Sequence, residues 1–240
     1  GAEDVRITVR SSRHGPIVSD VLAPAREATP RGYALAFAWT TLAEDDLSIQ
    51  SIGRMPLARN WEEFTAALRD FASPQQNIVY ADVDGNIGFI APGRVPVRKR
   101  DNDLKGLAPA PGWDARYDWA GYVPFDELPR SYNPASGRLW TANEKILMPG
   151  YPHHITSEWQ EPYRSERIGE LLEASKKHNQ SSFARMHADV VSLAARELLP
   201  RLRETRAKSE DARKVLRLLE AWQGEMLAQR TEPLVLWAWW

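Results

Sequence analysis

The spacing of apolar residues changes near residue 164, and this change sets the fold class. Before it, apolar residues occur in short runs separated by Pro- and Gly-rich stretches. After it they recur at helical spacing, as at Ile168, Leu171 and Leu172. We therefore expect an α+β fold, with a β-rich portion over residues 1–163 and a helical segment over residues 164–240.

Local signals predict strands in the first portion. Residues 5–10 alternate apolar and polar side chains, which favours a half-buried strand, and residues 12–16 form a turn. Residues 33–39 are an apolar run of strand length, although their alanines leave a helix open. Residues 77–82 and 87–90 flank an Asp-Gly pair, which predicts a β-hairpin because Gly accepts a positive φ.

Helix boundaries are marked by capping residues and prolines. Asn60 can cap a helix whose third position is Glu63, and Pro74 ends it. In the second portion, Ser181 or Ser182 can cap the helix that precedes Asp189. Pro200 should end or kink the next helix, because it lacks the backbone N–H and its ring crowds the preceding turn.

The composition excludes several function classes. The chain has 31 basic and 32 acidic residues, which disfavours a nucleic-acid partner held by bulk charge. We interpret the run 98–100, Arg-Lys-Arg, as a solvated loop. No apolar run approaches the length of a membrane span, so we predict no membrane partner. Since there is no Cys, disulfides and thiolate chemistry are excluded.

No self-sufficient catalytic motif is present. The sequence lacks a Gly-x-Ser-x-Gly elbow, a phosphate loop and a His-Glu-x-x-His helix. His14, in the turn before Gly15-Pro16, is either a base or a structural residue, and a lone His in a turn is more often structural.

Residues 91–137 combine Pro and Gly with closely spaced aromatic residues. These are Trp113, Tyr117, Trp119, Tyr122 and Phe125. The segment is too aromatic for a disordered linker, and we favour packing onto the neighbouring sheet. The alternative function that it leaves open is a carbohydrate- or peptide-binding module.

Several short motifs occur in a fixed order along the chain. The first is Arg13-His14-Gly15-Pro16-Ile17, and the second runs from Asn60-Trp61 to the hairpin that contains Asp82, Gly85-Asn86 and Gly88. The later ones are Pro111-Gly112, Asp118-Trp119, Pro124-Phe125, Tyr132-Asn133-Pro134, Ala142-Asn143 and Tyr163-Arg164. Together they resemble the penicillin acylase family of N-terminal nucleophile hydrolases.

This resemblance implies a four-layer αββα sandwich with a helical excursion. In that family a precursor cleaves itself, and the first residue of the large subunit, usually Ser, is the nucleophile, with its own amine as the base. Only 13 residues precede His14, and Gly1 has no side chain. The nucleophilic Ser is thus expected to lie outside this chain. We therefore expect an internal fragment of the large subunit of a periplasmic or secreted enzyme, inactive alone. Its expected partners are the rest of that subunit and the small subunit.

The resemblance also implies roles for four residues. Asn143 matches the oxyanion-hole Asn, and Arg164 matches the Arg that supports the nucleophile's amine. Trp39 and Gln76 fall near positions that line the acyl pocket. The intact enzyme would hydrolyse a linear amide, either a β-lactam side chain or an acyl-homoserine lactone. Without the resemblance, Asn143 is a turn residue and Arg164 a solvated charge at a helix start.

Many members of that family bind calcium, partly through an Asp soon after the catalytic Asn. That position falls here at His154-Ile155, so one ligand is lost. We assign no metal ligand and no cofactor to the chain, although calcium stays possible in the intact family fold.

Overall fold

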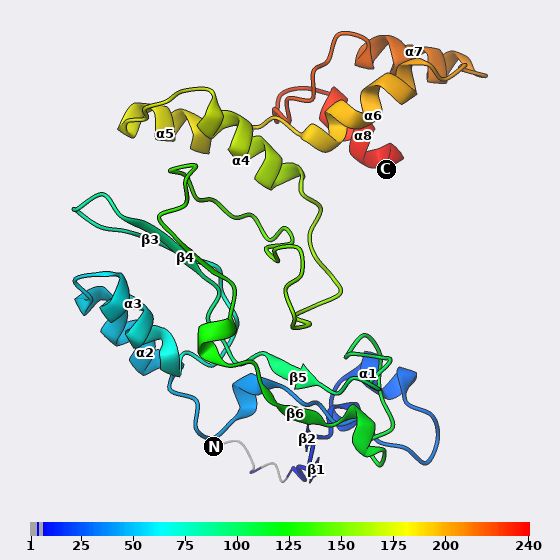
Figure 1. The fold of residues 1–240 in the computed structure, drawn as a ribbon. Coiled ribbons are helices and arrows are strands. Elements are labelled where there is room, and N and C mark those ends of the chain that lie inside the picture. The colour runs from blue at the N-terminus through cyan, green and yellow to red at the C-terminus, as the bar shows by residue number, and fades with distance from the viewer. Residues whose placement is uncertain (1–3, 5–6) are drawn as a thin grey trace. The chain divides into compact units, whose positions relative to one another are not determined.

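A computed structural model describes residue 4 and residues 7–240 (Figure 1). The chain contains both helices and strands, which confirms the predicted α+β class. It divides into two compact units. Unit 1 comprises the described residues up to Gly137 together with Leu147–Ser157, and unit 2 comprises Arg138–Ile146 and Glu158–Trp240. The predicted boundary between residues 163 and 164 stays a prediction.

Unit 1 holds the strands and the first helices. The strands are β1 (Ser11–Ser12), β2 (Gly15–Pro16), β3 (Ile78–Ala81), β4 (Ile87–Ile90), β5 (Pro96–Arg98), β6 (Trp119–Tyr122) and β7 (Arg130–Tyr132). The helices are α1 (Ala23–Ala28), α2 (Ser48–Arg54) and α3 (Trp61–Ala67).

The predicted hairpin forms two strands of the three-stranded sheet of unit 1. β3 and β4 pair antiparallel, with Ile78 opposite Ile90, and β7 adds to the free edge of β4. Gly85 has a φ of 87° in the connecting turn, as the Asp-Gly signal required. The hairpin prediction is confirmed.

The predicted cap of α3 is confirmed, with one difference. Asn60 accepts a hydrogen bond from the backbone N–H of Glu63 at 2.8 Å. The Glu63 carboxylate accepts from the N–H of Arg59, not from that of Asn60. The exchange still occupies two donors at the helix start, and it sets the direction in which α3 leaves.

Trp61 joins α3 to the sheet. Its ring stacks on Tyr132 of β7 with centroids 5.2 Å apart and also contacts Tyr80 of β3. Gly88 of β4 makes room for this ring, since a Cβ there would fall 2.3 Å from Trp61 Cζ3. The sequence places Trp61 directly after the cap, so the cap and the glycine together seat the helix.

Two strand predictions near the N-terminus are wrong. Residues 5 and 6 lie outside the described residues, and residues 7–10 form no strand, with Ile7 and Val9 each 76% exposed. Residues 33–39 form a single bridge, from Ala36 to Ile17. The turn at residues 12–16 does form, between β1 and β2. Backbone pairing in this region is limited to short contacts. The alternation of apolar and polar residues therefore predicted longer strands than the structure contains.

The segment 91–137 is ordered by packing. β5 pairs with β6, and Val95, Val123 and Leu128 form a small buried cluster that Phe125 also contacts. The solvated-loop interpretation of residues 98–100 is wrong for Arg98, which ends β5 and is half-buried.

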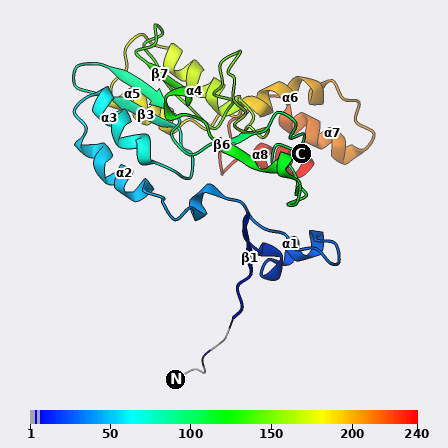
Figure 2. The ribbon, with the colours of Figure 1, turned by 60° about the horizontal axis from the view of Figure 1, so that its bottom comes forward.

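Unit 2 contains the helices α4 (Tyr163–Glu173), α5 (Gln180–His187), α6 (Leu193–Arg203), α7 (Glu210–Leu219) and α8 (Glu232–Trp239). Both views show α6, α7 and α8 gathered together (Figures 1 and 2). Their core contains Trp222, which is fully buried, with Leu199, Leu219 and Leu236. Among the described residues, no helix has the length and apolar character that a membrane crossing requires.

The predicted cap of α5 is wrong, and of the two outcomes predicted at Pro200 the helix end does not occur. The cap of α5 is Asn179, which accepts from the N–H of Ser182, while Ser182 returns a bond to the N–H of Asn179. α6 continues through Pro200 to Arg203. Leu199 is buried and Leu202 packs on the same core, so burial on both sides of Pro200 offsets its cost of about 3 kcal/mol.

We predict that Gly88→Ala destabilises the protein by about 1–3 kcal/mol, because the added methyl group forces the Trp61 ring to move. Urea unfolding measures the change. In a Trp61→Leu background the same substitution should cost less than half as much, because the clashing ring is gone. Equal costs in both backgrounds would contradict this packing.

Candidate functional site

Asn143 lies in a tight turn that fixes its backbone. Its φ is 68°, in the left-handed region, where Asn is among the few non-glycine residues commonly found. The Glu144 carboxylate accepts from the N–H of Ala142 at 2.6 Å, and the Asn143 carbonyl accepts from the N–H of Gln160 at 3.2 Å. The turn therefore presents the Asn143 side chain to solvent on a held backbone.

Trp140 attaches this turn to α4. Its indole N–H donates to the Ser165 hydroxyl at 3.1 Å, and Ser165 is buried. The ring also covers Gly169, where a Cβ would fall 3.0 Å from Trp140 Cζ2. The turn and the first half of α4 thus form one packed element within unit 2.

The structure brings Asn143 and Arg164 together. Arg164 Nη2 donates to Asn143 Oδ1 at 2.9 Å. A guanidinium has only donors, so the side-chain oxygen of Asn143, and not its nitrogen, must face Arg164. The hydrogen-bonding chemistry of the two groups therefore fixes the orientation of the Asn143 amide. The Asn143 Nδ2 group then points away from Arg164, and it donates no hydrogen bond within the described part of the chain. This geometry leaves an oriented amide donor.

Two further contacts hold α4 in place. Arg167 binds the Asp189 carboxylate with two bonds, at 2.9 and 2.6 Å, and also contacts Glu170. The Arg167 bond lowers the pKa of Asp189, and the Asp189 bond raises the pKa of Arg167. Tyr163 donates to Glu197 of α6 at 2.8 Å, which raises the pKa of the Tyr163 hydroxyl. Arg164 stands between these two anchored residues.

Trp39 and Gln76 belong to unit 1. Trp39 is 47% exposed, and its ring lies 5.6 Å from that of Phe37. Gln76 is exposed, and its backbone N–H donates to Pro92. The segments that carry them are joined by a hydrogen bond between Thr41 and Ser73. Their predicted role in the acyl pocket stays a prediction.

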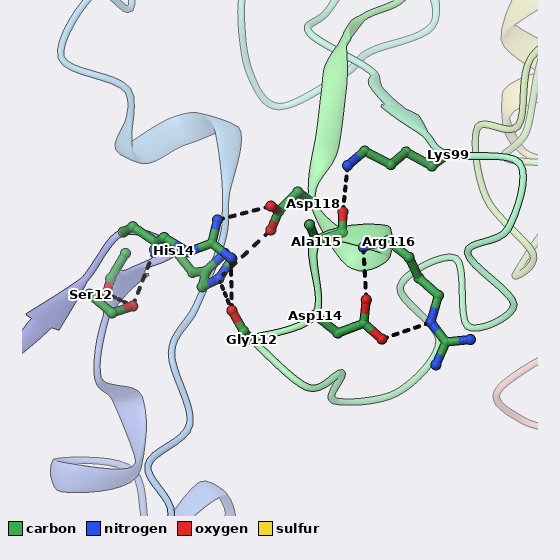
Figure 3. A network of polar contacts seen from close by, with 10 residues as sticks. Ser12, His14, Lys99, Gly112, Asp114, Ala115, Arg116 and Asp118 are labelled. Carbon is green, nitrogen blue, oxygen red and sulfur yellow. Dashed lines mark hydrogen bonds and ion pairs between the residues drawn. The ribbon is translucent and has the colours of Figure 1, made fainter.

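His14 has a structural environment. Its Nε2 lies 2.9 Å from the Gly112 carbonyl, which only accepts, so Nε2 carries the proton (Figure 3). Arg13 binds the same carbonyl and Asp118, and its hydrogen bond lowers the pKa of Asp118. Gly15 has a φ of 114°, and a Cβ there would fall 2.3 Å from the Phe37 oxygen. The His-Gly-Pro turn therefore ties distant segments of unit 1 together.

The residues that support the candidate site are not apparent from the sequence. Trp140, Glu144, Gln160 and Asp189 received no role, although they position Asn143 or α4. Only Glu144, next to Asn143, could have been inferred from spacing, because its contact is local. The others act across 17 or more positions in the sequence.

The chain matches the penicillin amidase family model over residues 1–240. The chain belongs to the penicillin amidase family. Penicillin acylase 2 proenzyme of Pseudomonas sp. (strain SE83) is 33% identical over 228 residues, covering 94% of the chain and 28% of that protein. Acyl-homoserine lactone acylase QuiP of Pseudomonas aeruginosa is 34% identical over 203 residues, covering 82% of the chain and 23% of that protein.

A solved relative shares the fold of this penicillin amidase family member. Thermostable penicillin G acylase from Alcaligenes faecalis superposes with a TM-score of 0.73 and 25% identity, covering 95% of the chain and 40% of that structure. The prediction of an N-terminal nucleophile hydrolase fold is thus confirmed. The chain spans about a quarter of the length of the two sequence relatives named above.

The side chains around His154 do not fit calcium. Calcium takes oxygen ligands, whereas this position offers an imidazole, and the charges of Lys105 and Arg98 act on it. Among the described residues, no group of three or more His, Asp or Glu side chains is arranged to hold a metal ion.

We predict that Asp189→Asn destabilises the protein by about 1–3 kcal/mol at pH 7, because Arg167 loses the less exposed of its two carboxylate partners and keeps only Glu170. The folded-state pKa of Asp189 is lowered, so this contribution is present above about pH 4 and is lost as pH falls through the lower folded value. Urea unfolding at pH 7 and at low pH measures both effects.

The control is Asp211→Asn, which removes an exposed pair with Lys214 and should change stability by less than about 0.5 kcal/mol. The account of α4 fails if the two variants are equally stable, or if the Asp189→Asn deficit persists unchanged in acid.

Proposed function

We propose that the intact protein carrying this chain is an amidohydrolase acting on a linear amide of an acylated small molecule. The candidate substrates are a β-lactam with an acyl side chain and an acyl-homoserine lactone, the classes for which the two relatives are named. The nucleophile is an N-terminal Ser outside this chain, exposed by self-cleavage of a precursor. The 240-residue chain alone is therefore inactive.

The observation that carries this proposal is the bond between Arg164 and Asn143. Attack on an amide places negative charge on the carbonyl oxygen, and an oriented N–H donor stabilises that oxygen. Asn143 Nδ2 is such a donor. Because Arg164 draws electron density from the amide oxygen, it strengthens the donor on the opposite side. Arg164 has a second proposed role, in which its positive charge supports the environment of the nucleophile's amine.

The packing of the aromatic segment 91–137 favours the hydrolase over a carbohydrate- or peptide-binding module. Phe125 contacts two buried clusters, and Trp119 and Tyr122 contact each other on β6. Trp113 is 73% exposed, but its ring lies 5.8 Å from Tyr33. These rings are used mainly inside unit 1.

The remaining proposals are a periplasmic or secreted location, and association with a small subunit and the rest of the large one.

We predict that Asn143→Gly lowers kcat of the intact enzyme by about 10²–10³-fold with little change in KM, because the oxyanion loses a donor. Glycine accepts the φ of 68°, so the backbone of the turn is not strained. Steady-state hydrolysis of an acylated substrate measures the effect. The 240-residue chain serves as the negative control and should show no turnover.

The matched control is Asn133→Gly. Asn133 also has a positive φ, of 46°, but its side chain joins Ile87 and Asn86 in unit 1. This variant should lower the unfolding temperature and leave kcat unchanged. The proposed role of Asn143 is wrong if Asn143→Gly keeps more than about a tenth of the wild-type kcat, or if the 240-residue chain hydrolyses the substrate.

We also propose that Trp39 and Gln76 line the acyl pocket of the intact enzyme. A polar amide at Gln76 disfavours a purely aromatic acyl group, because its hydrogen-bonding groups lose water without gaining partners. Trp39 supplies an apolar wall. Support comes from the link between their segments and from the exposure of both side chains.

We predict that Gln76→Leu raises kcat/KM for a phenylacetyl amide about tenfold relative to a hydroxyl-bearing acyl group. Competition between the two substrates measures the ratio directly. Gln75→Leu is the control, since Gln75 instead donates to the Ala91 carbonyl and should change stability rather than preference. An unchanged ratio in Gln76→Leu would remove Gln76 from the pocket.

A further inference from the structure

Arg98 is a half-buried arginine without a partner in the described part of the chain. It ends β5, and burial lowers the pKa of its guanidinium, with no carboxylate to oppose that shift. A Cβ added to Gly106 would fall 2.7 Å from Arg98 Nη2, so the guanidinium lies against that backbone. An arginine that leaves water is normally paired with an anionic group.

Lys105 directly precedes Gly106, whose backbone lies against this guanidinium, and the Lys105 side chain is exposed. Asn102 is 2% exposed, and its Oδ1 accepts from the N–H of Lys105 at 2.7 Å. The N–H of Asn102 donates to Lys99, and Lys105 has a left-handed φ of 46°. A buried side chain thus holds a second cation in a conformation that lysine rarely adopts.

His154 completes the group. It is half-buried, and its pKa is lowered first by burial and then by the charges of Lys105 and Arg98. Its neighbour Ile155 packs against the cluster of Val95 and Val123 next to β5. Two cations and an imidazole therefore gather at one place in unit 1.

Nearby acidic residues do not neutralise this group. Asp103 accepts a hydrogen bond from the Tyr117 hydroxyl at 3.0 Å, and Asp101 is exposed. Neither forms an ion pair with Arg98, Lys105 or His154 within the described residues. Two cations without a carboxylate partner among the described residues favour an anion as ligand.

We propose that Arg98, Lys105 and His154 form a binding site for a carboxylate group. The planar guanidinium offers two parallel donors that match the two carboxylate oxygens, and the lysine and imidazole supply further donors. The carboxylate comes either from a free small molecule or from an acidic side chain elsewhere in the intact protein. The inference does not depend on the proposed hydrolase activity.

The test is the thermal unfolding midpoint of the 240-residue chain in rising sodium citrate, against sodium chloride at equal ionic strength. Citrate should raise the midpoint with the logarithm of its concentration. Arg98→Met should lose this response, while Arg100→Met, which alters an exposed neighbour, should keep it. Stabilisation that arises because citrate is excluded from the protein surface does not need Arg98. It should therefore be equal in the wild type, Arg98→Met and Arg100→Met.

A second readout uses the folded wild-type chain. The NMR signal of the Arg98 Nε–H should shift saturably with citrate, and Lys105→Met should weaken the affinity about tenfold. If the carboxylate is an acidic side chain of the intact protein, the unfolding midpoint of the intact protein should not depend on citrate. Arg98→Met should then lower that midpoint in buffer without citrate. Equal citrate responses in Arg98→Met and Arg100→Met, or stabilisation by calcium chloride above sodium chloride, would overturn the proposal.

Discussion

The hydrogen bond from Arg164 to Asn143 is the constraint on which the candidate site depends. A guanidinium can only donate, so the bond determines which end of the Asn143 amide faces outward. With the oxygen engaged, the exposed end is an N–H donor of fixed direction. An isolated Asn in a turn could rotate and present either end. The same contact that stabilises the turn therefore orients the donor that the proposed oxyanion-hole role needs.

The precision of that bond rests on contacts further along α4. Trp140 seats the turn on Ser165 and Gly169, and the Arg167–Asp189 pair holds the helix itself. Each contact joins residues distant in sequence but within unit 2. The donor is thus positioned by packed and charged contacts of its own unit, as preorganised catalytic groups require.

Local physics made part of this molecule predictable from sequence. The Asn60 cap and the Asp-Gly hairpin depend on neighbouring residues, and both were predicted correctly. Alternation failed at residues 7–10, because a strand also needs a partner edge, which spacing does not reveal. Pro200 was expected to end or kink α6, but the helix does not end there, because burial of Leu199 outweighs the local cost.

The residues of the candidate site also divide into those that the sequence suggested and those that it did not. Asn143 and Arg164 are predicted through ordered motifs that resemble a known family, whereas no periodicity or spacing singles them out, and their catalytic roles stay a prediction. Asp189 was missed because its effect passes through Arg167, one turn away from Arg164 on α4. Arg98, which has no carboxylate partner among the described residues, was also missed, since a short basic run is interpreted as solvated when its burial is unknown.

The most direct test of the central claim is a crystal structure of the intact protein with a phosphonate bound to the N-terminal serine that we propose as its nucleophile. Our account predicts Asn143 Nδ2 at about 2.7–3.1 Å from the phosphonyl oxygen that mimics the oxyanion. It also predicts that Oδ1 remains bonded to Arg164. An Asn143 side chain turned away from that oxygen, or released from Arg164, would contradict it.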